Sequence, residues 1–93
     1  TLEYTLRKTI EGMAERLRDN PTDVNDLSAL RAAIELTEEL PFKVTLWSVQ
    51  NVAYDLLQDI YPGVFDKKDT DEDAREWVGH FEVLAHKLSL RMD

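Results

Sequence analysis

Apolar residues recur at intervals of three and four along most of this chain. That interval is the period of an amphipathic helix, in which the apolar side chains form one stripe. The densest example is the stretch of residues 40–61, which holds one of the two tryptophans and two of the three tyrosines. No segment alternates apolar and polar residues, as a half-buried strand would. The pattern therefore predicts an all-α protein.

The first half of the chain contains two amphipathic segments. The first covers residues 2–19 and stops before Pro21, because the residue that precedes a proline avoids the helical region. The second begins at Thr22 or Asn25, either of which is an acceptable N-cap, and ends or kinks at Pro41.

The second half of the chain contains two more segments. Thr45 is the expected N-cap of a third helix, which stops at the Tyr-Pro-Gly sequence of residues 61–63. Residues 64–69 are predicted to form a polar loop, and Thr70 is the expected N-cap of the fourth helix. The expected core stripe of this helix consists of Ala74, Trp77, Val78, Phe81, Leu84, Ala85, Leu88 and Met92. Because short links favour antiparallel neighbours, the four segments predict a four-helix up-down-up-down bundle.

Chain length, charge and cysteine content limit the functions open to such a bundle. Residues 1–93 form a single helical domain, and the first residue is Thr1 rather than methionine, so we expect a C-terminal fragment of a larger protein. The net charge of −8 opposes approach to phosphate backbones and anionic membranes, so neither nucleic acid nor a membrane is the expected partner. The absence of cysteine fits a reducing compartment, and we expect a cytoplasmic protein.

Catalytic and metal-binding patterns are weak. Residues 69–73 resemble the start of a calcium loop, but the required glycine and glutamate are missing further on, and stabilisation of a helix start explains the acids more simply. Glu76 with His80, and Glu82 with His86, have helical spacing but face different directions, which favours solvated pairs over a metal site. Phosphate-binding loops and nucleophile motifs are absent. The sequence thus predicts no catalytic residue, metal or cofactor.

One flank of the third segment carries aromatic and polar residues together: Trp47, Gln50, Tyr54 and Tyr61. This flank is either a wide buried face with the Gln50 amide hydrogen-bonded inside, or a contact surface, because aromatic residues with polar groups concentrate at interfaces. An aromatic strip of this kind also suits stacking on sugar rings. In an up-down bundle, Tyr61 ends its helix close to the end from which Trp77 rises.

An off-core stripe lies on the fourth segment and consists of Gly79, Val83, His86 and Leu90. These residues are either scattered surface positions or a surface that docks a neighbouring domain of the same chain, with Gly79 permitting close approach.

Three short motifs resemble a known family. They are Leu-Arg-Lys-Thr-Ile at residues 6–10, Pro-Phe-x-Val-x-Leu-Trp-x-x-Gln-Asn at residues 41–51, and Ala-Arg-Glu-Trp at residues 74–77. They are similar to the C-terminal helical region of bacterial glycoside hydrolase family fifty-seven proteins, the alpha-amylase and alpha-mannosidase-like group. In that family the catalytic carboxylates lie in an N-terminal barrel, and nothing in this chain matches them.

The resemblance implies a non-catalytic accessory domain of a larger, glucan-acting protein, which packs against the catalytic domain. The implied partners are this neighbouring domain and, through the aromatic flank, a glucan. The alternative, from a different class, is a free-standing helical module that mediates protein–protein interaction.

Overall fold

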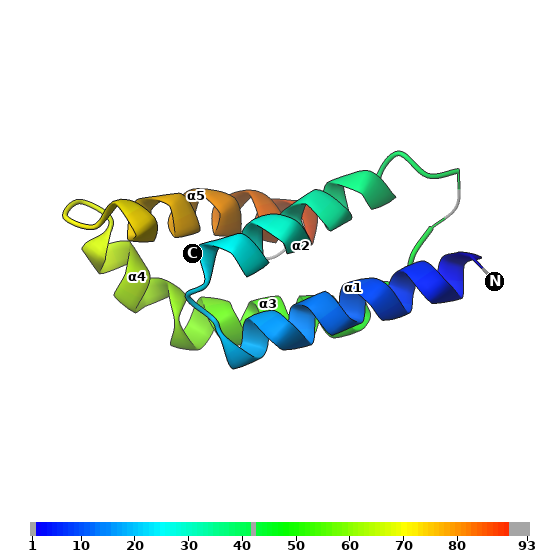
Figure 1. Ribbon diagram of the computed structural model, residues 1–93, viewed down its shortest axis with the longest axis horizontal. Coiled ribbons are helices and arrows are strands. Elements are labelled where there is room, and N and C mark those ends of the chain that lie inside the picture. The colour runs from blue at the N-terminus through cyan, green and yellow to red at the C-terminus, as the bar shows by residue number, and fades with distance from the viewer. Residues whose placement is uncertain (1, 42, 90–93) are drawn as a thin grey trace.

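The fold is all-α in the computed structural model, which describes residues 2–41 and 43–89. Within these residues there are five helices and no strand: α1 (Leu2–Asp19), α2 (Val24–Thr37), α3 (Trp47–Asp59), α4 (Tyr61–Lys67) and α5 (Glu72–Lys87). The four longer helices lie along the long dimension of the molecule, and α4 runs obliquely at one end, where it links α3 to α5 (Figure 1). The molecule is elongated and measures 45 × 24 × 20 Å.

Each of the four longer helices contributes buried apolar residues to a single core. α2 packs against both α1 and α5, α3 packs against α1, and α4 packs against α3 and α5. The stripe expected on the fourth segment is buried throughout its described length. The largest fully buried side chains are Trp77, Phe81, Ile10, Leu17, Leu27, Leu30, Ile34, Leu84 and Val49. No polar or charged side chain is fully buried among the described residues.

Trp77 stands at the centre of the aromatic part of this core. Its ring stacks on Phe81 with centroids 4.9 Å apart, and the Tyr61 ring lies 6.4 Å away, which confirms the predicted proximity of Tyr61 and Trp77. The indole Nε1 donates a hydrogen bond of 2.7 Å to the Pro21 carbonyl oxygen. Trp77 therefore ties α5 to the turn between α1 and α2.

The helix α4 corrects two expectations from the sequence. Residues 64–69 were expected to form a loop and the chain was expected to have four helices, but the residues from Tyr61 to Lys67 are helical. Pro62 lies in the first turn of α4, where the missing backbone N–H costs nothing because first-turn N–H groups lack a helical partner anyway. Tyr61 and Val64 then pack against the core from this added helix.

The helix starts also differ from the predicted caps. Asp23, rather than Thr22 or Asn25, caps α2 by accepting from the Asp26 N–H at 3.1 Å. Asp71, rather than Thr70, caps α5 and accepts from two N–H groups. Aspartate caps both helices because its short carboxylate reaches the unpaired N–H groups of the first turn.

A third difference is at α3, where Leu46 occupies the N-cap position without a side-chain hydrogen bond. The expected cap, Thr45, instead donates its backbone N–H toward Glu3 of α1. The start of α3 is therefore held by tertiary contact with α1 rather than by a side-chain cap.

Candidate contact surface on α3

The aromatic flank predicted on the third segment divides into an exposed part and an internally bonded part. Trp47 is 68% exposed and Tyr54 is 54% exposed. Gln50 is half-buried, and its Nε2 donates a 3.1 Å hydrogen bond to the carbonyl oxygen of Leu88, at the C-terminal end of α5. Tyr61 is also half-buried and packs against the core. Gln50 and Tyr61 therefore have partners within the bundle, while Trp47 and Tyr54 face outward.

We call the exposed Trp47, Asn51 and Tyr54, with Gln50 at their inner edge, the α3 face. Trp47 and Tyr54 are seven residues apart, which is two helical turns, so both side chains project from the same side of α3 at a separation of about 10 Å along the axis. Residues 44–54 contain no Asp, Glu, Lys or Arg, although 32% of the whole chain is charged. The α3 face is therefore aromatic, uncharged and able to form hydrogen bonds.

Further exposed apolar residues lie at the same end of the molecule. α1 begins, α2 ends and α3 begins at this end (Figure 1). Leu2 and Tyr4 of α1 are 69% and 51% exposed, and Leu36 of α2 is 53% exposed. Together with Trp47, these residues form a group of exposed large apolar side chains near this end of the molecule.

Tyr61 is the residue of this flank whose pKa is shifted. Its hydroxyl donates a 2.7 Å hydrogen bond to Glu82 Oε2. Burial of the phenol, the hydrogen bond to Glu82 and the negative charge of that carboxylate together raise the pKa of Tyr61 to about 12. Tyr61 therefore stays neutral in the folded protein under physiological conditions and acts as a hydrogen-bond donor.

The raised pKa of Tyr61 predicts a loss of stability in strong alkali. The unfolded chain loses the phenolic proton near the reference value of 10.0, whereas the folded chain holds it to about 12. The stabilising contribution is therefore complete below pH 10.0 and is lost as the pH rises toward 12. Ultraviolet titration of tyrosinate, compared between the native chain and Tyr61→Phe, measures this pKa. Glu82→Gln should move the midpoint downward, and an unchanged midpoint would contradict the role of the Glu82 charge.

The off-core stripe on α5 is only partly an open surface. Gly79 and His86 are exposed, Val83 is half-buried, and Leu90 lies outside the described residues. A Cβ added at Gly79 would meet no heavy atom within 4 Å. The glycine is therefore not required by packing inside this bundle, and the stripe stays a prediction for the docking of a neighbouring domain.

Three of the histidine and acidic residues in and before α5, His80, Glu82 and Asp71, are engaged in other contacts. His80 Nδ1 lies 3.0 Å from Arg31 Nη1 on α2, and Glu82 accepts from Tyr61. Asp71 is engaged in capping the helix. Among residues 2–41 and 43–89, no three His, Cys, Asp or Glu side chains come close enough together to hold a metal ion.

An open depression of about 280 Å³ lies at the other end of the bundle, where α4 meets the start of α5. Lys67, Asp71 and Asp73 provide its charged groups, and Trp77 lies beneath it. The Asp71 carboxylate already accepts two backbone hydrogen bonds. Asp71 is therefore already engaged in holding the start of α5.

The comparisons with known proteins leave the sequence and its geometry as the only guide. The chain matches no protein family, no curated protein and no solved structure. Separately, none of the helices in the described ranges combines the length and apolar character needed to span a membrane.

Proposed function

We propose that this chain is a non-catalytic helical interaction domain that contacts its partner through the α3 face. The observation that carries the proposal is the exposure of Trp47 and Tyr54, both above half, within residues 44–54, which contain no charged side chain. Interface cores are enriched in tyrosine and tryptophan and depleted of charged residues, and this combination fits the α3 face. The proposed scaffold is an up-down-up-down bundle of the four longer helices, to which α4 is added at one end.

The resemblance to family fifty-seven supplies a setting for this interaction. In that setting the chain is an accessory domain of a larger, glucan-acting protein, and the α3 face packs against the catalytic domain. The Pro-Phe-x-Val-x-Leu-Trp-x-x-Gln-Asn motif at residues 41–51 supports this, because it contains three of the four α3-face residues. The alternative setting, a free-standing interaction module, uses the same face.

Hydroxyl-radical footprinting tests the proposal at the level of single residues. Trp47 and Tyr54 should react readily in the purified 93-residue chain and become protected, several-fold, in the longer protein in which we propose that it resides. Phe65 on α4 is the matched control, because it is 40% exposed and lies away from the α3 face. Equal reactivity of Trp47 and Tyr54 in the two samples would contradict the proposal.

A glucan is a second candidate for the α3 face. Two exposed aromatic side chains that are attached about 10 Å apart along the axis of α3, with the Asn51 amide between them, suit stacking on the sugar rings of a linear chain together with hydrogen bonds to hydroxyl groups. Titration with a linear α-glucan oligosaccharide to millimolar concentration should change the fluorescence of the native chain. Trp47→Phe, which retains only Trp77, should show no change. A native chain that does not respond would remove the glucan and leave the protein partner.

A further inference from the structure

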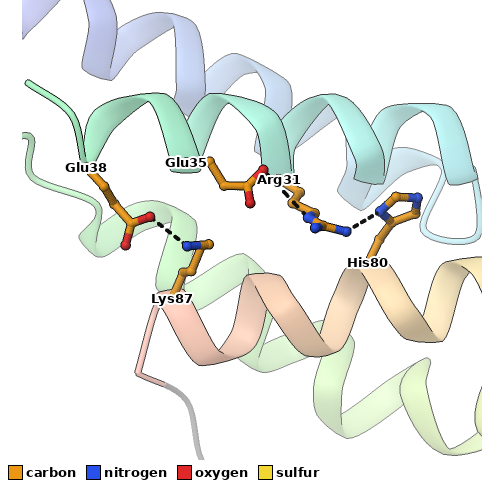
Figure 2. A network of polar contacts seen from close by, with 5 residues as sticks. All are labelled: Arg31, Glu35, Glu38, His80 and Lys87. Atoms are coloured by element: carbon orange, nitrogen blue, oxygen red, sulfur yellow. Dashed lines mark hydrogen bonds and ion pairs between the residues drawn. The ribbon is translucent and has the colours of Figure 1, made fainter.

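The interface between α2 and α5 contains a row of polar contacts that no part of the proposed function uses. Figure 2 shows Arg31 of α2 pointing toward His80 of α5, with Glu35 on the other side of the guanidinium. Arg31 Nη1 lies 3.0 Å from His80 Nδ1, and Arg31 Nε lies 3.7 Å from Glu35 Oε1. Further along the same two helices, Lys87 Nζ lies 2.7 Å from Glu38 Oε1.

The contact between Arg31 and His80 fixes the state of the imidazole. A guanidinium has five N–H donors and no acceptor, so His80 Nδ1 must be the acceptor. Nδ1 accepts only when the ring is neutral and its proton is on Nε2. A proton added to Nδ1 would replace the hydrogen bond with two N–H groups of like charge facing each other.

We propose that Arg31 and His80 form a proton-sensitive latch between α2 and α5, which is closed while the imidazole is neutral and released when it takes up a proton. The protonated ring has another partner on its own helix, because Glu76 precedes His80 by four residues, which is a favourable spacing for an ion pair. Protonation thus transfers His80 from a cross-helix contact to a contact within α5.

The contacts around His80 indicate that protonation would release this one contact and would not separate α2 from α5 as a whole. From α2, Arg31 remains bound to Glu35 after His80 leaves it. The pair of Glu38 and Lys87 joins opposite charges, so it does not depend on the imidazole proton. On the α4 side of α5, the ionisable groups Tyr61 and Glu82 bond to each other. The released segment is therefore the part of the interface around Arg31 and His80.

A double-mutant cycle with Arg31→Met and His80→Leu tests the latch through its pH dependence. At about pH 8, the coupling between the two residues should change the unfolding equilibrium constant by roughly three- to tenfold. At about pH 5.5, the coupling should disappear and leave the constant unchanged. These two pH values lie on either side of the range in which imidazoles titrate. The matched control is a cycle on Glu38 and Lys87, whose coupling should be the same at both pH values. Equal coupling of Arg31 and His80 at the two pH values would overturn the proposal.

Nitrogen NMR of the histidine rings supplies a second readout, whose main measurement uses the native chain. At alkaline pH, His80 should have its proton on Nε2, and Arg31→Lys should shift the balance between the two tautomers. His86 is the internal control, because it is exposed and is the only other histidine of the chain. A predominant Nδ1–H tautomer of His80 at alkaline pH would also refute the latch.

Discussion

Trp77→Ala is expected to lower the free energy of unfolding by about 3–5 kcal/mol. The side chain is 1% exposed, its ring stacks on Phe81, and its indole N–H holds the Pro21 carbonyl. Alanine removes these contacts and leaves a cavity among helices that cannot close it without moving. A chain of this size has about 5–14 kcal/mol of stability in total, so the substitution removes a large part of it.

Trp47→Ala is the matched control for this prediction. The substitution deletes the same side chain, but Trp47 is 68% exposed, and surface changes of this kind alter stability by about 0.5 kcal/mol or less. Urea denaturation followed by circular dichroism compares the two variants without relying on tryptophan emission. If the two variants lost equal amounts of stability, the assignment of Trp77 to the core and Trp47 to the surface would be wrong.

Trp77→Phe separates the ring from its hydrogen bond. Phenylalanine can keep the stacking on Phe81 but cannot donate to the Pro21 carbonyl. The loss should be smaller than for alanine, at about 1–3 kcal/mol, because the Pro21 carbonyl oxygen loses its partner and some apolar volume is removed. A value equal to that of Trp77→Ala would mean that the hydrogen bond and the indole volume dominate over ring stacking.

The double substitution Gly12→Ala and Gly79→Ala is expected to raise the free energy of unfolding by about 1–2 kcal/mol. Both glycines are exposed and lie inside helices, α1 and α5 respectively. A Cβ at either position meets nothing within 4 Å, so alanine adds helix propensity without a clash. The two effects should add, because α1 and α5 do not pack against each other as neighbouring helices.

Thermal unfolding measures this gain, which corresponds to a rise of about 4–8 °C in Tm for each kcal/mol in a domain of this size. The single variants also test the predicted docking stripe on α5. If Gly79 permits close approach of a neighbouring domain, Gly79→Ala should stabilise the isolated chain and yet weaken that docking. Gly12→Ala should stabilise the chain and leave docking unchanged. A destabilised single variant would contradict the open surroundings of that glycine.

The helices could be predicted from the sequence because the apolar pattern depends on residues three and four positions apart. The stripe from Ala74 to Leu88 is buried as predicted, and α1 ends at Asp19 before Pro21, as the proline requires. The sequence did not determine the structure at residues 61–63, because a proline that can stop one helix can also begin the next. In the folded chain these residues are helical, and Tyr61 and Val64 of α4 pack against the core.

Only part of the candidate site could be predicted from the sequence. The sequence indicated a flank of Trp47, Gln50, Tyr54 and Tyr61, but it could not separate exposed members from covered ones. The latch between Arg31 and His80 gave no sequence signal at all, because its partners are 49 residues apart. Contacts of that kind depend on how two helices are aligned, which periodicity within either helix does not specify.

Periodicity by itself therefore determined that this chain is helical and which side of most helices faces the core. The tertiary structure alone decided that Gln50 and Tyr61 are covered while Trp47 and Tyr54 are not. All four lie on one flank of the third segment, so the local pattern treats them alike. Their difference arises because the end of α5 reaches Gln50 and the α4–α5 packing reaches Tyr61. Coverage depends on where distant helices end and cross, and that information lies in contacts between residues far apart in the chain.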